Sequence, residues 1–423
     1  MKKSIFFVSL VILSLFSCQD AFEESTQISV ISKSKIGTAN KRSYEEALLV
    51  AQHSISMLDK ASLTRSAVPS RSLDLANGAF VVCTDNLETR SSCDSKNDTL
   101  MYVFNFNDNK GFALVSANMQ TEALLAITEQ GFYDPSTECI NKDFSYIIEL
   151  AKQYVLHGDD NILAKSKTIT RADIDLWIFS SSIDNLINVN WGQTNPEGLY
   201  CPYGTCGCAI TAMAMLMSYY NYPTSITIDY DLNNIIQDYT LDWTEMKKHI
   251  SIHQPGFSCN ASTNAHNMIS HLCRQLGKVA GCTYRSNGDT AISPGDAIPC
   301  LENYGYTVSD PGFIDFSEQN IVNELNNGHP VIMMGYYDFY WGQGHFWVVD
   351  GYCRYVISDS LDPNYGPPVY KYYNHINWGW DGDCNGYFLS GVFNTQGADT
   401  YDSFSTQNHD YTFYNIYYIA PYL

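Results

Sequence analysis

The hydrophobic and polar positions first predict a small N-terminal unit of helix and sheet. Residues 43–60 carry apolar side chains at helical spacing, and Ser43 with Glu46 has the spacing of a capping box. Strand-like runs follow at GAFVVCTD, TLMYVFNFND and KGFALVSAN, and the turn signal NDNKG joins the last two as in a hairpin. A helix at 143–157 closes this α+β unit, which contains no convincing catalytic constellation.

The second half of the chain places helices first and strands after them. The pattern predicts helices over 173–187, 208–220, 263–277 and 295–304, and the second of these ends at Asn221-Tyr222-Pro223. Strands are expected at PVIMMGYY, HFWVVDGY, VYKYYNHINW, GYFLSGVF and YTFYNIYYIAPYL. Helices followed by antiparallel strands are typical of an α+β fold with a helical lobe against a β-rich lobe.

Charge divides the 423 residues at about residue 171. The first 171 residues hold 17 basic and 20 acidic side chains, a balance of −3, whereas the remainder holds 7 and 25, a balance of −18. A half so poor in cations is not expected to bind nucleic acid or anionic lipid. The basic segment before the boundary predicts a cleavage site at Lys165, Lys167 or Arg171.

The N-terminus predicts export. Lys2 and Lys3 precede an apolar run at 5–16 that is too short to span a membrane, and LFSC then places Cys18 where a lipoprotein signal peptide has its lipidated cysteine. A plain secretory signal is the alternative. We therefore expect a lipoprotein of the outer membrane or cell surface, or one secreted after maturation. The expected organisation is a signal peptide at 1–17, a tether at 18–42, an N-terminal domain at 43–171 and a second domain at 172–423.

Three residues in the second domain have the order and spacing of a thiol-based active site. Cys208 opens a predicted helix after Gly207, His345 lies in GHFWVVDGY, and Asn377 lies in HINWGWDGD. The 137-residue interval from 208 to 345 falls in the ~130–150 residue range of papain-like enzymes. The pattern therefore predicts a cysteine peptidase.

Each of these residue types has a chemical role. A helix N-terminus favours a thiolate at Cys208, and His345 would accept the thiol proton and later protonate the leaving amine. Asn377 would hydrogen-bond the second imidazole nitrogen and fix the tautomer, with Trp378 and Trp380 shielding that bond from water. Gln193, in NWGQTNP, is expected to donate its amide to the oxyanion.

Other interpretations of the cysteines remain open. Cys208 taken alone would more often be buried or disulfide-bonded, and Cys201, Cys206 and Cys208 could bind zinc with a histidine. No second spaced ligand pair accompanies them, so we expect no metal and no cofactor. The chain has thirteen cysteines, and without Cys18 and Cys208 an odd number remains, so at least one further thiol is unpaired. Among the possible disulfides, Cys83 with Cys93 is the easiest to envisage.

The motifs GCAITAMAMLMSYYNYP, GHFWVVDGY and HINWGW resemble the streptopain family of bacterial cysteine peptidases, and residues 73–135 resemble that family's inhibitory propeptide. The resemblance implies a papain-like two-lobed peptidase made as a zymogen, with protein substrates and its own propeptide as intramolecular inhibitor. It implies the catalytic roles named above. It also implies that Gly344, Thr290 and Trp378 border the substrate.

Two departures from the family pattern bear on specificity and oxidation. Cys206 precedes Gly207, and bulky Phe346 and Trp347 follow the histidine, which would narrow the cleft. A papain-fold surface adhesion or binding protein without catalysis is the competing hypothesis, and acyl transfer to an amine other than water is a third.

Overall fold

The protein is described by a computed structural model of the 423-residue chain. The described residues are 40–61, 71–83, 87–88, 99–136, 142–157, 177–230, 236–251, 261–308, 312–338, 343–357, 368–394 and 415–423. Within them, no helix is both long and apolar enough to cross a membrane. Cys18, the predicted cleavage sites and the boundary at residue 171 lie outside the described residues, so these predictions remain untested.

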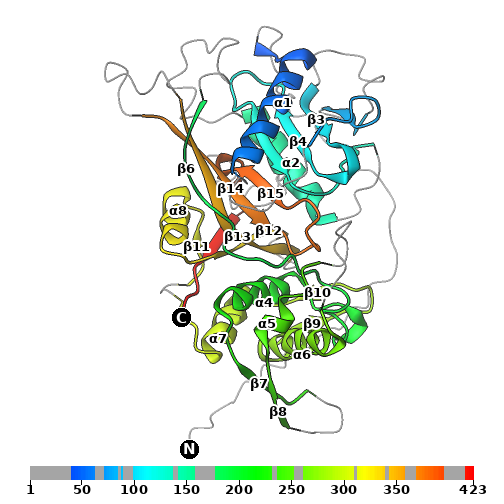
Figure 1. The fold of residues 1–423 in the computed structure, drawn as a ribbon, viewed down its shortest axis with the longest axis vertical. Helices are drawn as coiled ribbons and strands as arrows, with labels where there is room; N and C mark the ends of the chain where they lie inside the picture. The colour runs from blue at the N-terminus through cyan, green and yellow to red at the C-terminus, as the bar shows by residue number, and fades with distance from the viewer. Residues whose placement is uncertain are drawn as a thin grey trace, which may run out of the picture. The chain divides into compact units, whose positions relative to one another are not determined.

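The N-terminal unit has the predicted elements and two further strands, β2 and β5. Helices α1 and α2 pack on an antiparallel sheet, seen in the upper part of Figure 1. The capping box forms as predicted, since the Ser43 backbone N–H donates to Glu46 Oε2 at 2.8 Å and the Glu46 N–H donates to Ser43 Oγ at 3.2 Å. The elements are α1 (Tyr44–Ala61), β1 (Ala79–Cys83), β2 (Leu87–Glu88), β3 (Thr99–Asn105), β4 (Phe112–Ser116), β5 (Leu124–Thr128) and α2 (Lys142–His157).

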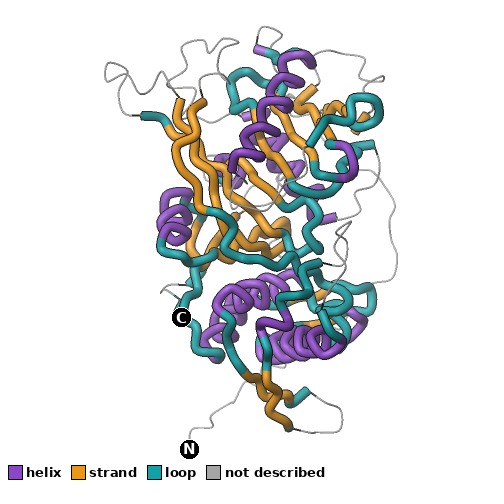
Figure 2. The backbone as a smooth tube through the Cα atoms, in the orientation of Figure 1, coloured by secondary structure: helices purple, strands orange, loops and turns teal. Residues whose placement is uncertain are grey.

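A second group of elements forms the helical lobe. Figure 1 shows α4 to α7 gathered together, and Figure 2 shows them as the purple helices below the orange strands of the large sheet. The bounds are α4 (Cys208–Tyr220), β7 (Ser225–Ile228), β8 (Gln237–Thr240), α5 (Trp243–Met246), α6 (Thr263–Val279), β9 (Thr283–Tyr284), β10 (Thr290–Ala291) and α7 (Pro294–Asn303). Helix α4 is apolar on every side and buried from Ala209 to Ser218, as expected of a helix inside a core.

The remaining elements form the β lobe. They are β6 (Trp177–Ile183), β11 (Ile314–Asp315), α8 (Glu318–Asn326), β12 (Val331–Asp338), β13 (Gln343–Ile357), β14 (Tyr370–Asn377), β15 (Gly386–Leu389) and β16 (Asn415–Ile419). One sheet runs in the order β11-β16-β12-β13-β14-β15-β5-β4-β3-β1-β2, and β6 pairs with β13. The predicted α+β class is therefore confirmed.

The two sequence halves share this sheet. Strand β5 of the N-terminal unit pairs antiparallel with β15, so that Ile127 lies opposite Tyr387 and Ala126 opposite Phe388. One apolar core extends from α1 and α2 to Trp347 and Phe393. The N-terminal unit thus completes the sheet of the second half and covers its edge.

Alternation along β13 directs its side chains to two different cores. Phe346 and Val348 pack with the helical lobe, whereas Trp347 and Val349 pack with the core shared with the N-terminal unit. His345 is on the same face as Trp347, and the two rings are stacked with centroids 6.2 Å apart. The strand therefore presents the histidine toward the side that the N-terminal unit covers.

One predicted element is wrong. Residues 173–187 were expected to be helical, but 177–183 form β6, which pairs with Tyr352 to Ile357 of β13. The exposed hydrogen-bonding edge of β13 overrides the local helical pattern here, because pairing satisfies both backbones. Cys83 is disulfide-bonded, and its predicted partner Cys93 lies outside the described residues.

Candidate active site

Cys208 is the first residue of α4, and its position depends on the glycine before it. Gly207 adopts φ 91°, and a Cβ there would lie 1.9 Å from Thr290 Oγ1, so only glycine fits. Cys208 is half-buried and lines a cavity between the two lobes. The unpaired N–H groups and positive end of the helix dipole at this position favour negative charge on the sulfur.

His345 is almost fully buried, and both of its ring nitrogens have defined neighbours. Nε2 lies 3.0 Å from the backbone oxygen of Trp378. A carbonyl oxygen can only accept, so Nε2 carries the hydrogen. Nδ1 lies 3.1 Å from Oδ2 of Asp143 in the first turn of α2, which makes an ion pair by distance without the alignment of a hydrogen bond.

The electrostatics link His345 to both Cys208 and the N-terminal unit. Burial alone would lower the pKa of His345, but the neighbouring Cys208 thiolate and the Asp143 carboxylate outweigh burial and raise this pKa to about 10. Cys208 acts on the ring through its charge. The thiol and the imidazole are therefore close enough to interact, and the Asp143 carboxylate lies at Nδ1.

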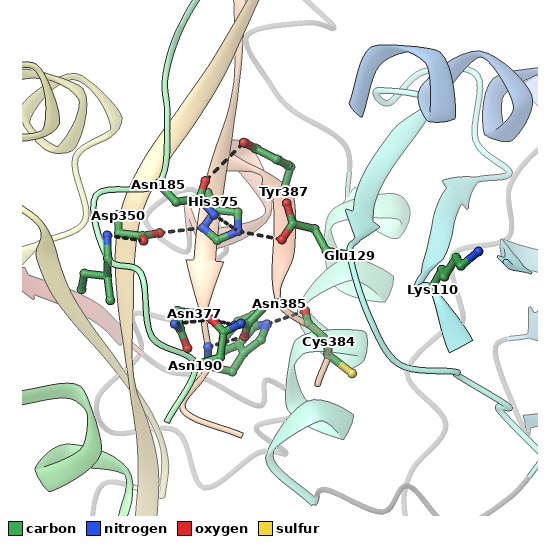
Figure 3. A network of polar contacts seen from close by, with 12 residues as sticks. Lys110, Glu129, Asn185, Asn190, Asp350, His375, Asn377, Cys384, Asn385 and Tyr387 are labelled. Atoms are coloured by element: carbon green, nitrogen blue, oxygen red, sulfur yellow. Dashed lines mark hydrogen bonds and ion pairs between the residues drawn. The ribbon is translucent and has the colours of Figure 1, made fainter. Parts of the chain in front are cut away.

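The Asn377 side chain does not contact His345 in this structure. Its Nδ2 donates to Val189 O at 2.9 Å and to Asn190 Oδ1 at 3.1 Å, and its Oδ1 accepts from the Gly379 N–H at 3.2 Å. The acceptor on the imidazole is instead the backbone oxygen of the next residue, Trp378. The physical reason is that the Asn377 side chain is occupied elsewhere: its Oδ1 holds the turn through Gly379, and its amide joins a polar cluster with Asn190 and Asn385, which Figure 3 shows.

Tryptophan rings enclose the histidine. Trp380 lies 4.9 Å from His345 between ring centroids, and Trp378 lies 6.3 Å away and stacks on Trp380 at 5.3 Å. The two rings thus enclose the imidazole, although the Asn377–His345 bond that they were expected to shield is not formed in this structure. Trp378 was also expected to border the substrate, but its side chain is fully buried and does not line the cavity.

The cavity beside Cys208 contains the other two predicted substrate-contacting residues. Thr290 and Gly344 both line it, and Phe346 adds an aromatic wall while Trp347 points into the opposite core. The complete lining is Cys206, Gly207, Cys208, Ala209, Ile210, Thr290, Ala291, Ile292, Met334, Gly335, Gly344 and Phe346. Most of the lining side chains are apolar, but polar and apolar atoms contribute about equally to the exposed wall.

Gln193 lies at the start of the loop that leads to Cys208. Its backbone oxygen accepts from the Cys206 N–H at 2.8 Å, and its side chain is half-buried outside the cavity lining. Its role as an oxyanion donor stays a prediction. In the part of the chain that the structure describes, no group of three or more His, Cys, Asp or Glu side chains is arranged to hold a metal ion.

A second histidine pairs with a carboxylate of the N-terminal unit. Figure 3 shows His375 between Asp350, whose Oδ1 lies 2.6 Å from Nδ1, and Glu129, whose Oε2 lies 3.6 Å from Nε2. Burial would lower the pKa of His375, but Asp350 and then Glu129 raise it to about 9. We interpret this histidine as structural.

Sequence reasoning missed Asp143 and the Trp378 carbonyl. The first-turn position of Asp143 is visible in the sequence only as an acidic residue that suits a helix N-terminus. Nothing local relates it to a histidine some 200 residues later, because α2 and β13 come together only through the shared sheet and core.

The fold and the site together define a class: a two-lobed thiol peptidase whose N-terminal domain covers His345. Residues 189–388 match the model of the Peptidase C10 family, and residues 32–155 match that of the Spi protease inhibitor. The second half of the chain therefore carries a Peptidase C10 domain and the first half an inhibitor domain, and the protein is a cysteine peptidase zymogen with an inhibitory propeptide.

Two relatives support this assignment. Streptopain of Streptococcus pyogenes is 24% identical over 340 residues, which cover 71% of this chain and 76% of streptopain. The solved structure of a prointerpain A fragment from Prevotella intermedia superposes with a TM-score of 0.50 at 20% identity, covering 82% of this chain and 98% of the fragment. The second likeness supports the papain-like fold with its propeptide.

Proposed function

We propose that this chain is the precursor of an exported cysteine endopeptidase in which Cys208 is the nucleophile and His345 the general base. The observation that carries the proposal is the pairing of Cys208, at the N-terminus of a buried helix, with an imidazole held by the Trp378 carbonyl. A thiol, a base and a group that orients the base are the parts that nucleophilic acyl transfer requires.

The reaction follows from the orientation of the ring. Nε2 keeps its hydrogen on Trp378 O, so Nδ1 accepts the proton of Cys208, and the resulting thiolate attacks the peptide carbonyl. The backbone N–H of Cys208 and the amide of Gln193 stabilise the oxyanion. His345 then protonates the leaving amine, and water hydrolyses the acyl-enzyme with His345 as base.

Asp143 gives the propeptide a direct means of keeping the enzyme inactive. Its carboxylate is at Nδ1, the nitrogen that must receive the proton of Cys208. An imidazolium paired with a carboxylate cannot act as a base, and the propeptide also covers the ring. Maturation must therefore remove Asp143 from the site.

The cavity and the surface charge suggest the kind of substrate. Ile292, Met334 and Phe346 provide an apolar wall beside the thiol, which favours an apolar or aromatic side chain near the scissile bond. The −18 balance after residue 171 would attract cationic proteins at low salt. Equal effects of salt on the cleavage of cationic and anionic proteins would contradict the second point.

Export and lipid attachment at Cys18 belong to the same proposal, and the signal-like sequence of residues 1–18 supports them. Labelling of expressing cells with a radioactive fatty acid tests this point. Label in the wild type and none in Cys18→Ala is the expected result, whereas a secreted, unlabelled wild type would indicate a plain signal peptide.

The test of the peptidase assignment is mass spectrometry of purified precursor over time, under reducing conditions and with casein present. We expect the wild type to lose its propeptide and degrade casein, and Cys208→Ala to do neither. Cys282→Ala, which removes another half-buried thiol, is the matched control and should behave as the wild type. A wild type that neither processes itself nor degrades casein, even after its propeptide has been clipped by an added protease, would favour the binding-protein hypothesis.

A further inference from the structure

The chain between the predicted oxyanion donor and the nucleophile is a closed loop. The Cys206 N–H donates to Gln193 O at 2.8 Å and thereby joins its two ends. Inside it, the Cys201 N–H donates to Gly198 O at 2.9 Å and the Gly204 N–H to Cys201 O at 3.1 Å. We call residues 193–206 the oxyanion loop. Its shape sets the position of Gln193 relative to Cys208.

The oxyanion loop contains a carboxylate that the proposed mechanism does not use. Glu197 is 1% exposed, and its Oε1 lies 3.1 Å from Nε2 of His249, which is completely buried. His249 follows α5, and its backbone oxygen accepts from the indole N–H of Trp191 at 2.8 Å. One residue of the helical lobe thus holds both the middle of the loop and the segment that leads into Gln193.

A second contact fixes the same part of the loop. The hydroxyl of Ser270 in α6 donates to the backbone oxygen of Pro196, the residue before Glu197. A Cβ on Gly198 would lie 2.3 Å from Gly204 O and 2.8 Å from Gln193 O, so the backbone is closely packed across the loop at this point. A shift of Glu197 would therefore be transmitted to Gln193.

Stability alone does not account for a charged group in this place. Replacing a buried ion pair by apolar side chains is often neutral or stabilising, because desolvation offsets the attraction between the charges. In this pair the Oε2 atom of Glu197 has no hydrogen-bond partner among the described residues, which adds a further cost. A buried polar group that costs stability in this way is expected mainly at positions where function requires it.

We propose that Glu197, through its pair with His249, is a positioning residue that holds the oxyanion loop in its catalytic geometry. The inference rests on the proposed roles of Cys208 and Gln193. It predicts that the pair affects steps that build an oxyanion and does not affect the reactivity of the thiol itself.

The test compares two kinds of thiol chemistry in mature enzyme prepared from the full-length precursor. Hydrolysis of a peptide amide and binding of a peptide aldehyde both place an oxyanion at the site, whereas alkylation by iodoacetamide forms none. For Glu197→Gln we expect kcat to fall by roughly 10- to 100-fold, since the loss of one oxyanion donor costs ~10²–10³. We expect the aldehyde to bind more weakly in parallel, with KM and the alkylation rate unchanged.

Glu245→Gln is the matched control, because Glu245 is a partly exposed carboxylate of the neighbouring helix α5 that pairs with Lys248. It should leave kcat, KM, the affinity for the aldehyde and the alkylation rate unchanged. An unaltered kcat in Glu197→Gln, or an alkylation rate that falls together with kcat, would overturn the inference. Wild-type enzyme that hydrolyses no amide would contradict the proposed function instead.

A second variant covers the case in which Glu197→Gln does not fold. In Glu197→Leu/His249→Leu both buried polar side chains are replaced by apolar ones, so this chain is expected to fold with a Tm no lower than that of the wild type. The inference predicts the same loss of kcat with unchanged alkylation. Wild-type kcat in this double variant would overturn it.

Discussion

At the scale of single residues, the site depends on which neighbour each nitrogen of His345 has. The Trp378 carbonyl accepts from Nε2, and the Asp143 carboxylate lies at Nδ1. In the proposed mechanism Nδ1 receives the proton of Cys208 once the propeptide has left, so the same imidazole serves latency first and catalysis afterwards. The two states then differ in whether the Asp143 carboxylate lies at Nδ1.

Removal of that carboxylate should weaken latency. In Asp143→Asn the pKa of His345 falls, because one of the charges that raise it is lost, and a neutral ring becomes available to Cys208. We expect self-processing at neutral pH to accelerate by on the order of tenfold, the effect of about one pKa unit, as measured by the rate of propeptide loss. Asp134→Asn, a change in another propeptide carboxylate, is the control. Equal rates in all three proteins would contradict the role of Asp143.

Asn377 should affect stability rather than the protonation of the imidazole. Asn377→Ala leaves its buried partners, including Val189 O and the Gly379 N–H, without their hydrogen bonds, at a cost of ~1–3 kcal/mol. We expect a lower Tm and an unchanged pH dependence of kcat/KM in the mature enzyme. A shifted pH profile at wild-type Tm would restore to Asn377 the orienting role that the sequence suggested.

At the scale of secondary-structure elements, the seam between β5 and β15 joins the propeptide to the peptidase. A Cβ on Gly386 would lie 2.4 Å from Ile127 O and 2.5 Å from Thr128 Cα, both of them propeptide atoms. Gly386→Ala should therefore displace β5. Gly391→Ala, close to the same seam, meets only the ring of Tyr154 at 3.5 Å and should be tolerated.

The measurement uses the Cys208→Ala precursor. Trypsin first cleaves it at the predicted sites between Lys165 and Arg171, and the product is then passed over a size-exclusion column. We expect the propeptide to stay bound in the parent and in Gly391→Ala, and to separate in Gly386→Ala. A propeptide that co-elutes equally in all three would show that the β5–β15 seam contributes little to binding.

Elements with a strong local signal were predictable and those that depend on partners were not. The capping box of α1 and the apolar run of α4 encode their own boundaries. Residues 177–183 had no such signal for β6, because they become a strand only against the edge of β13. The order of Cys208 and His345 in the sequence was informative, but the choice between the Asn377 side chain and the Trp378 carbonyl depends on a turn whose geometry the pattern does not specify.

At the scale of the whole molecule, two propeptide carboxylates meet two peptidase histidines across the shared sheet and core. The pKa of His345 is raised to about 10 and that of His375 to about 9, against 6.5 in an unfolded chain. A raised pKa means that the folded state binds the proton more tightly. The stabilisation is therefore fully present below pH 6.5 and is lost as pH rises through 9 and 10.

The zymogen should accordingly become less stable between pH 6.5 and 10. Thermal unfolding of the Cys208→Ala precursor, which cannot process itself, measures the part that His375 contributes as a Tm that falls up to about pH 9, because this variant lacks the Cys208 charge that raises the pKa of His345. The decline should be smaller when Glu129→Gln is added, since His375 has then lost one of its two carboxylate neighbours. A Tm that is flat over this range in the precursor would contradict the assigned protonation of His375.

The central claim, that Cys208 and His345 act as a pair, is tested most directly by locating a covalent adduct. Mature enzyme is treated with a peptidyl fluoromethyl ketone and analysed by peptide mass spectrometry. The account predicts one adduct, on Cys208, whose rate of formation falls steeply in His345→Ala. An adduct on another cysteine, or one that forms at Cys208 equally fast without His345, would contradict it.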